Sequence, residues 1–198
     1  LAGMMMIPMM IGMLGTSITV GWIISRTGHY KWYPAAGMAL VATALGLMST
    51  LNPGTPTAVI GGNLFLMGFG LGLVMQVLVL IVQNSFPVRV VGTATASNNF
   101  FRQIGGAVGS SVVGAIFIHR MQDLLAQRMP ADAVFSPEAA STLTPAILES
   151  LPGPIHDVVV GSYNDAFTPV LLMLVPLMLA AAIILAFVRE DKLKETVE

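Results

Sequence analysis

The 198-residue sequence contains no cysteine and few charged residues. Without cysteine, a disulfide framework and a thiolate metal site are both excluded. Charged residues make up 10% of the chain, whereas soluble chains carry roughly 25%. This shortage rules out a water-soluble enzyme. Nine basic residues against ten acidic ones also leave no electrostatic footprint for nucleic acid.

Apolar residues are abundant instead, at 55% of the chain, which is too much apolar surface for a disordered protein. They gather in long stretches without charge. A helix needs about 20 mostly apolar residues to cross a hydrocarbon core of about 30 Å, because every backbone polar group must be satisfied within the segment. We therefore predict an all-α integral membrane protein with five transmembrane helices, over residues 1–24, 33–51, 57–82, 91–118 and 166–188.

The positions of lysine and arginine predict how these spans are oriented, because basic loops are retained on the cytoplasmic side of a membrane. One side of the bundle collects Arg26, Lys31, Arg89, Arg189, Lys192 and Lys194, while the other holds Arg120 and Arg128. We expect residues 1–198 to form one polytopic region of the plasma (inner) membrane. The loop over residues 119–165 is then outside, and the tail over residues 189–198 is cytoplasmic.

The long outer loop is expected to contain short helices, because connections of this length usually have structure of their own. Ser136 and Thr144 each offer a capping hydroxyl followed by proline, which is typical of a helix start. An apolar stripe at helical spacing is formed by Met121, Leu124, Leu125 and Met129. We expect these helices to lie as a cap over the bundle at the membrane surface.

No set of residues suited to catalysis or metal binding emerges from the sequence. The three histidines, His29, His119 and His156, lack the paired spacing of a metal site. The spans supply no acid-base pair and no activated nucleophile. We expect neither an enzyme nor a bound cofactor.

The third span carries a small, polar face. Six of its residues fall within one quarter of the helix circumference: Gly61, Gly68, Gly72, Gln76, Val79 and Gln83. Small residues let membrane helices approach closely, and amides hydrogen-bond across helices. We interpret Gly68 and Gly72 as packing residues, while Gln76 fits a packing seam and a solute pathway equally well.

The fourth span carries the only charged side chain within the five spans, Arg102. It projects from the same side as Thr95, Asn98, Asn99, Gly106 and Gly109. Arg102 is about 15 Å along the helix from Gly92, near the middle of a core about 30 Å thick. A charge there costs about 3 kcal/mol on insertion scales, so it must face protein or a water-filled cavity.

Arg102 needs a partner, and no aspartate or glutamate lies within any span. Three candidates stay open: backbone carbonyls together with Asn98 and Asn99, an acidic group on a missing part of the protein, or an anionic group of a solute. The alternative is an arginine that snorkels to the inner interface and anchors the helix.

The fourth span also carries a family resemblance. The similar residues are Pro87, Arg89 and Gly92, followed by the run from Asn98 to Gly109 (NNFFRQIGGAVG). With them, the fourth span resembles the penultimate span of the fourteen-helix drug:proton antiporters of the Major Facilitator Superfamily. Gly21, Arg26 and Gly28 are similar to the cytoplasmic loop signature of that superfamily, with Ser25 in place of its acid. Gly3, Pro8, the Asp165-Ala166-Phe167 sequence and Pro169, opening the last span, are similar to the family as well.

The resemblance implies a partial C-terminal bundle of such a transporter, aligned with its last five helices. The N-terminal bundle is then missing from this chain, in agreement with a first span that begins without methionine or a basic segment. The family implies proton-coupled export of amphipathic small molecules or drugs by alternating access. We expect Arg102, Gln103, Asn98, Asn99 and Gln76 to line or position the route, and the proton carrier to lie on the missing part.

A second reading is a self-standing five-helix membrane protein that serves as a structural or oligomeric module. Its support is the dense pattern of small residues on the third and fourth spans, which favours close helix contacts. The expected packing residues are Gly68, Gly72, Gly105, Gly106 and Gly109. In both readings the lipid bilayer is a partner of the chain.

Overall fold

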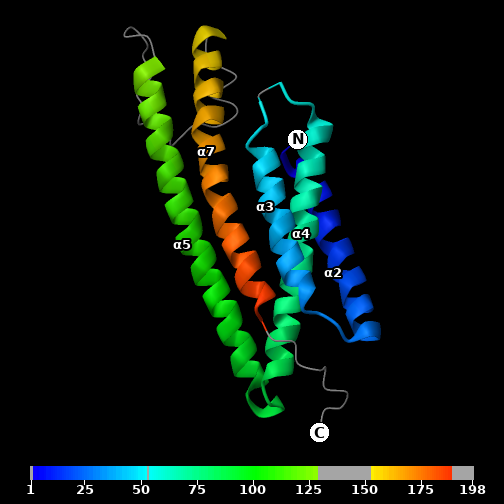
Figure 1. Ribbon diagram of the computed structural model, residues 1–198. Coiled ribbons are helices and arrows are strands. Elements are labelled where there is room, and N and C mark those ends of the chain that lie inside the picture. Colours follow the sequence, from blue (N-terminus) through cyan, green and yellow to red (C-terminus); the bar gives the residue numbers. More distant parts are fainter. Residues whose placement is uncertain (1, 53, 129–152, 189–198) are drawn as a thin grey trace.

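The structure is a computed structural model that describes residues 2–52, 54–128 and 153–188. Its described residues form helices joined by short turns (Figure 1). The helices are α1 (Ala2–Met5), α2 (Ile7–Thr27), α3 (Trp32–Met48), α4 (Thr57–Ser85), α5 (Val88–Arg128) and α7 (Gly153–Ala186). The expected all-helical membrane bundle is thus confirmed.

Four stretches of helix are long and apolar enough to cross a membrane: Gly3–Thr27, Thr57–Ser85, Val88–Arg128 and Ile155–Ala186. The remaining expected span, over residues 33–51, corresponds to α3, which is apolar but has only 17 residues. At a rise of about 1.5 Å per residue, α3 reaches about 25 Å, the lower end of what spans a bilayer.

Glycines bring α4 into direct contact with α2 and α3. A Cβ added at Gly72 would lie 2.5 Å from the carbonyl oxygen of Met13 on α2, and one at Gly68 would overlap the backbone of Met9. On the side toward α3, Gly70 and Gly37 meet in the same way, since a Cβ added at either would lie within 2.7 Å of the other's carbonyl oxygen. These contacts are closer than any side chain allows, so the three helices pack backbone to backbone.

The other two helices join the bundle through apolar clusters. α7 packs on α3, where Val41, Leu45 and Leu171 are buried together. α5 packs on α7 at the end far from the α4–α5 hairpin, where Met121 and Leu125 are buried against α7. α5 therefore lies at the edge of the bundle, as Figure 1 shows.

The loop expected over residues 119–165 is helical at both of its ends. α5 continues past 118 to Arg128, and α7 already begins at Gly153. The expected stripe of Met121, Leu124 and Leu125 is helical, but it belongs to α5 and packs on α7 rather than forming a separate cap. The physical reason is that each extension buries the other's apolar face. Met129 and the helix starts expected at Ser136 and Thr144 lie outside the described residues.

Pro169 was expected to open the last span, and it lies inside α7 instead, as does Pro176. Proline normally interrupts a helix because it lacks an N–H. Here the helix runs through because Val159 and Ala166, upstream of the first proline, are fully buried against α5. Tertiary packing therefore outweighs the local signal for a helix start.

Candidate functional site

The polar residues expected on the fourth span lie together on α5, in the half of the helix nearer the hairpin with α4. Asn98 and Asn99 are half-buried, and Arg102 and Gln103 are exposed. Arg102 lies about 21 Å along the helix from Val88, within a stretch that is long and apolar enough to cross a membrane. Within the part of the chain that the structure describes, Arg102 makes no hydrogen bond or ion pair. Its expected partner is therefore not supplied by these residues.

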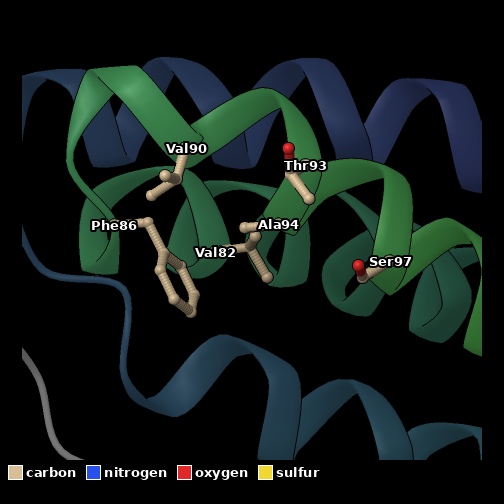
Figure 2. Close-up of a pocket in the computed structure, with 6 residues that line it drawn as sticks. All are labelled: Val82, Phe86, Val90, Thr93, Ala94 and Ser97. Carbon is tan, nitrogen blue, oxygen red and sulfur yellow. The ribbon is translucent and has the colours of Figure 1, made fainter.

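Between the hairpin and Arg102, the half-buried residues of α5 all lie within about 80° of Arg102 around the helix; they are Val91, Ala94, Thr95, Asn98 and Asn99. Close to the hairpin, a cleft of about 330 Å³ is lined by Val82 and Phe86 from the α4 side and by Val90, Thr93, Ala94 and Ser97 from α5 (Figure 2). At about 100° per residue, Thr93 lies about 180° and Ser97 about 140° around the helix from Arg102. Ala94, which also lines the cleft, lies about 80° from Arg102, so the cleft begins beside the face that carries the arginine and extends to the far side of α5.

Gln76, the remaining residue of the expected route, lies on α4 and is exposed. No hydrogen bond joins it to Asn98, Asn99, Arg102 or Gln103 among the described residues. The structure brings the four α5 residues together and leaves Gln76 as a separate polar position.

The expected packing glycines fall into two groups. Gly68 and Gly72 touch the backbone of α2, as described above. Around Gly105, Gly106 and Gly109 on α5, nothing described lies within 4 Å of an added Cβ. The expected packing of these three glycines is therefore not formed within the described part of this chain, because α5 stands away from α4 along its middle.

The loop after α2 carries the expected signature residues. Gly28 ends the helix in a left-handed conformation with φ 71°, and its N–H bonds the carbonyl of Ile24 at 2.8 Å, an arrangement that suits glycine. The guanidinium of Arg26 lies 4.0 Å from the ring centroid of Trp22. Gly21 lies inside α2 and borders open space. The loop is thus a helix-capping turn with an exposed cation.

Two polar contacts were missed by sequence reasoning. The Nδ2 of Asn84, at the end of α4, donates to the hydroxyl of Tyr30 at 3.5 Å, and both side chains are buried. At the far end, Arg128 on α5 pairs with Asp165 on α7 at 2.7 Å. Each pair joins residues distant in sequence, so periodicity could not reveal it. A polar side chain at a helix end, as at Asn84, is the only local signal.

A polar pocket of about 410 Å³ lies at the far end of the bundle. It is lined by the end of α3 and the turn after it, with Ser49, Thr50, Leu51 and Asn52, and by Asn164, Asp165, Thr168 and Pro169 of α7. Among the described residues no group of three or more histidine, cysteine or acidic side chains could hold a metal ion.

Comparisons with known proteins place these helices in a family. The family model described as the Major Facilitator Superfamily matches residues 1–110. An uncharacterised MFS-type transporter of Mycobacterium tuberculosis is 37% identical over 98% of this chain. The multidrug transporter protein MdtP of Bacillus subtilis is 37% identical over 65% of the chain, and a tetracycline resistance determinant of Streptomyces rimosus is 33% identical over 63%.

The fold and these comparisons define a multi-pass membrane protein of the transporter class. The chain belongs to the Major Facilitator Superfamily. It spans 28% of the length of the Mycobacterium tuberculosis relative, 24% of the multidrug transporter and 37% of the tetracycline resistance determinant.

Proposed function

We propose that this chain is the C-terminal portion of a secondary active transporter that exports amphipathic small molecules or drugs in exchange for protons by alternating access. The family membership supports transport, and the names of the multidrug and tetracycline resistance relatives support export of such compounds. The observation that carries the proposal is a polar strip on α5, a helix long and apolar enough to cross a membrane, in which Arg102 and Gln103 are exposed.

In this proposal, α5 forms part of the wall of the transport route. Arg102 and Gln103 supply exposed donors, and Asn98 and Asn99 extend the polar strip by one turn toward the hairpin. Polar side chains inside a membrane are costly and mark pathways for solutes or protons. Gln76, exposed on α4, supplies a second polar position. These residues line or position the route; they carry out no covalent chemistry.

The proton is carried elsewhere in this proposal. A membrane proton carrier is usually a carboxylate, and the first acidic residue of the sequence is Asp123, beyond the spans expected up to residue 118. The N-terminal bundle of a longer transporter is therefore the proposed partner that holds the carboxylate. The chain contributes route wall and contacts between the bundles.

The proposed location is the plasma (inner) membrane, with the α4–α5 hairpin and the chain's C-terminus in the cytoplasm. Arg26, Lys31 and Arg89 all lie at the hairpin end of the bundle, which suits the rule that basic loops remain inside. The aromatic rings of Phe117, Tyr163 and Phe167, which contact one another at the far end, suit the opposite interface.

The test is export by the complete gene product with Arg102→Ala. We expect export of an amphipathic dye to be lost while the protein accumulates normally in the membrane. Phe101→Ala, next along the helix and exposed, is the matched control and should export normally. Normal export by the Arg102→Ala variant would contradict the proposed role of Arg102 in the transport route.

The alternative, a self-standing oligomeric module, draws on the open surfaces at Gly105, Gly106 and Gly109. A stable oligomer of defined stoichiometry, formed by the 198-residue chain alone, would favour it. Degradation or aggregation of the isolated chain would favour the transporter.

A further inference from the structure

We propose that the face of α5 that carries Arg102 packs against a transmembrane helix outside this chain, and that a carboxylate on that helix pairs with Arg102. The inference rests on the proposed function, because the partner helix belongs to the remainder of the same transporter. It goes further by assigning the contact surface and the chemical group that completes it.

Of the candidate membrane spans in the described residues, α5 has the smallest buried share of its apolar window. None of its apolar window is buried, compared with 33% of the window of α4 and 22% of that of the first span. The only buried side chains on α5 are Met121 and Leu125, at the far end. A membrane helix with an intramembrane charge is not left in lipid on all sides, because the charge requires protein or water.

Glycines on the Arg102 face of α5 leave room for the backbone of a neighbouring helix. Gly105, Gly106 and Gly109 lie within about 60° of Arg102 around the helix, and each borders open space. Within the same chain, Gly68 and Gly72 show what such glycines do when a helix is present: its backbone fills the space that a Cβ would need. The three α5 glycines form a similar packing surface, but no helix of the described residues lies against it.

The opposite face of α5 has a different composition. Phe100, Ile104 and Val108 lie between about 120° and 160° from Arg102 and are exposed. Large apolar side chains of this kind suit contact with lipid tails or with apolar helices. The two faces of α5 are thus distinct, and the small, polar one is the side that fits a polar partner.

Charge identifies the group that the partner carries. The three carboxylates of the described residues already have cationic or imidazole neighbours: Asp123 lies 3.8 Å from His119, Asp157 lies 3.3 Å from His156, and Asp165 lies 2.7 Å from Arg128. The nearest in sequence, Asp123, is about 31 Å along α5 from Arg102. The seven other acidic residues of the sequence lie outside the spans expected from it. The proposal therefore places the anion that pairs with Arg102 on a helix outside this chain.

A carboxylate fits better than the other anions within reach of a membrane. Lipid phosphates lie at the interface, about 15 Å from the middle of the core. A second copy of this chain on the same face would be related by a two-fold axis and would bring Arg102 against its own copy, where like charges repel. A carboxylate on a different helix pairs with the guanidinium in two parallel hydrogen bonds.

Thiol cross-linking in the complete gene product tests this contact. The 198 residues contain no cysteine, so only cysteines elsewhere need replacement. Arg102→Cys is combined, one position at a time, with cysteine at each membrane-embedded aspartate or glutamate of the remaining protein, and a short bismaleimide is added to membranes. Phe101→Cys, which points about 100° away, is the matched control in every pair.

We expect one carboxylate position to cross-link with Arg102→Cys within a single polypeptide, with the product lost in the Phe101→Cys control. Exchange of charges, with Arg102→Glu and arginine at the identified position, should then restore the membrane abundance that Arg102→Glu alone loses. If Arg102→Cys does not accumulate, Asn98→Cys, one turn away on the same face, takes its place, with Phe100→Cys as its control on the other face.

The proposal is overturned if no carboxylate position cross-links, if Phe101→Cys cross-links equally well, or if the product is a dimer of two copies. A requirement for Arg102 only with anionic compounds, together with no cross-link, would assign the arginine to the solute instead. Cross-linking does not depend on export, so a protein that cross-links as expected but exports no dye would contradict the proposed function alone.

Discussion

Single glycines decide how closely the helices of this protein approach. Gly68 sits against the backbone of Met9, and backbone atoms cannot move aside as a flexible side chain can. Gly62, on the same helix, borders open space. Both residues are glycines in an apolar run, so their different roles follow only from what lies opposite them.

We expect Gly68→Ala to destabilise the detergent-solubilised protein by about 1–3 kcal/mol, the usual cost of overpacking. The added methyl group would force α2 and α4 apart. Gly62→Ala is the control and should be neutral or slightly stabilising, since alanine favours the helix. Equal thermal stabilities of the two variants, measured by the soluble fraction after heating, would contradict the assignment of Gly68 to the seam.

A buried hydrogen bond ties the loop after α2 to the end of α4. Tyr30 is 1% exposed and packs with Val20, Ile24 and Val77, while its hydroxyl accepts from Asn84. Buried polar groups are costly unless they are bonded. The pair therefore helps to hold the turn where the chain passes from α2 to α3.

Tyr30→Phe is expected to lower stability by about 1 kcal/mol, the net value of one such bond, while keeping the ring in place. Tyr33→Phe, at a half-buried tyrosine whose side chain makes no hydrogen bond among the described residues, should have no measurable effect. Thermal unfolding of both variants under the same conditions measures the difference. A larger effect at Tyr33 would show that the Asn84 contact contributes little.

α5 and α7 depend on each other for their length. Each extends beyond the span expected from hydropathy, because Met121 and Leu125 of one helix are buried against Val159 and Ala166 of the other. The ion pair between Arg128 and Asp165 adds little, since its side chains are 42% and 50% exposed and exposed pairs contribute at most about 1 kcal/mol.

Truncation of this cluster should loosen α5 at the far end of the bundle. We expect Leu125→Ala, at a position 0% exposed, to cost about 2–5 kcal/mol, as buried leucines do. Leu177→Ala, at a position 59% exposed, should change stability by less than about 0.5 kcal/mol. Proteolysis of the solubilised protein near Arg128 reports the loosening; equal cleavage of both variants would show that the cluster does not hold α5.

The whole molecule is a bundle with two different ends, and its proposed orientation follows from their charges. The hairpin end carries Arg26, Lys31 and Arg89, and the far end carries the Arg128–Asp165 pair. Since the positive-inside rule acts on short loops, the hairpin end is the one assigned to the cytoplasm.

In a cysteine-free background, we expect Gln127→Cys to react with a membrane-impermeant maleimide in intact cells. Ser85→Cys should react only after the cells are opened. Both side chains are exposed, at opposite ends of the bundle. The reverse pattern of labelling would invert the proposed topology, and labelling of both positions in intact cells would contradict a sealed span between them.

The sequence by itself determined that this is a helical membrane protein with a polar face on its fourth span. Both properties are local: a membrane crossing depends on about 20 consecutive apolar residues, and a helix face depends on spacing along one helix.

Only the tertiary structure decided which surfaces meet. Gly68 and Gly105 look alike in the sequence, yet one touches a neighbouring backbone and the other borders open space. The lengths of α5 and α7 and the Tyr30–Asn84 and Arg128–Asp165 contacts likewise depend on residues that lie far apart along the chain. Such contacts follow from how whole helices pack, and periodicity within a single helix carries no information about its neighbours.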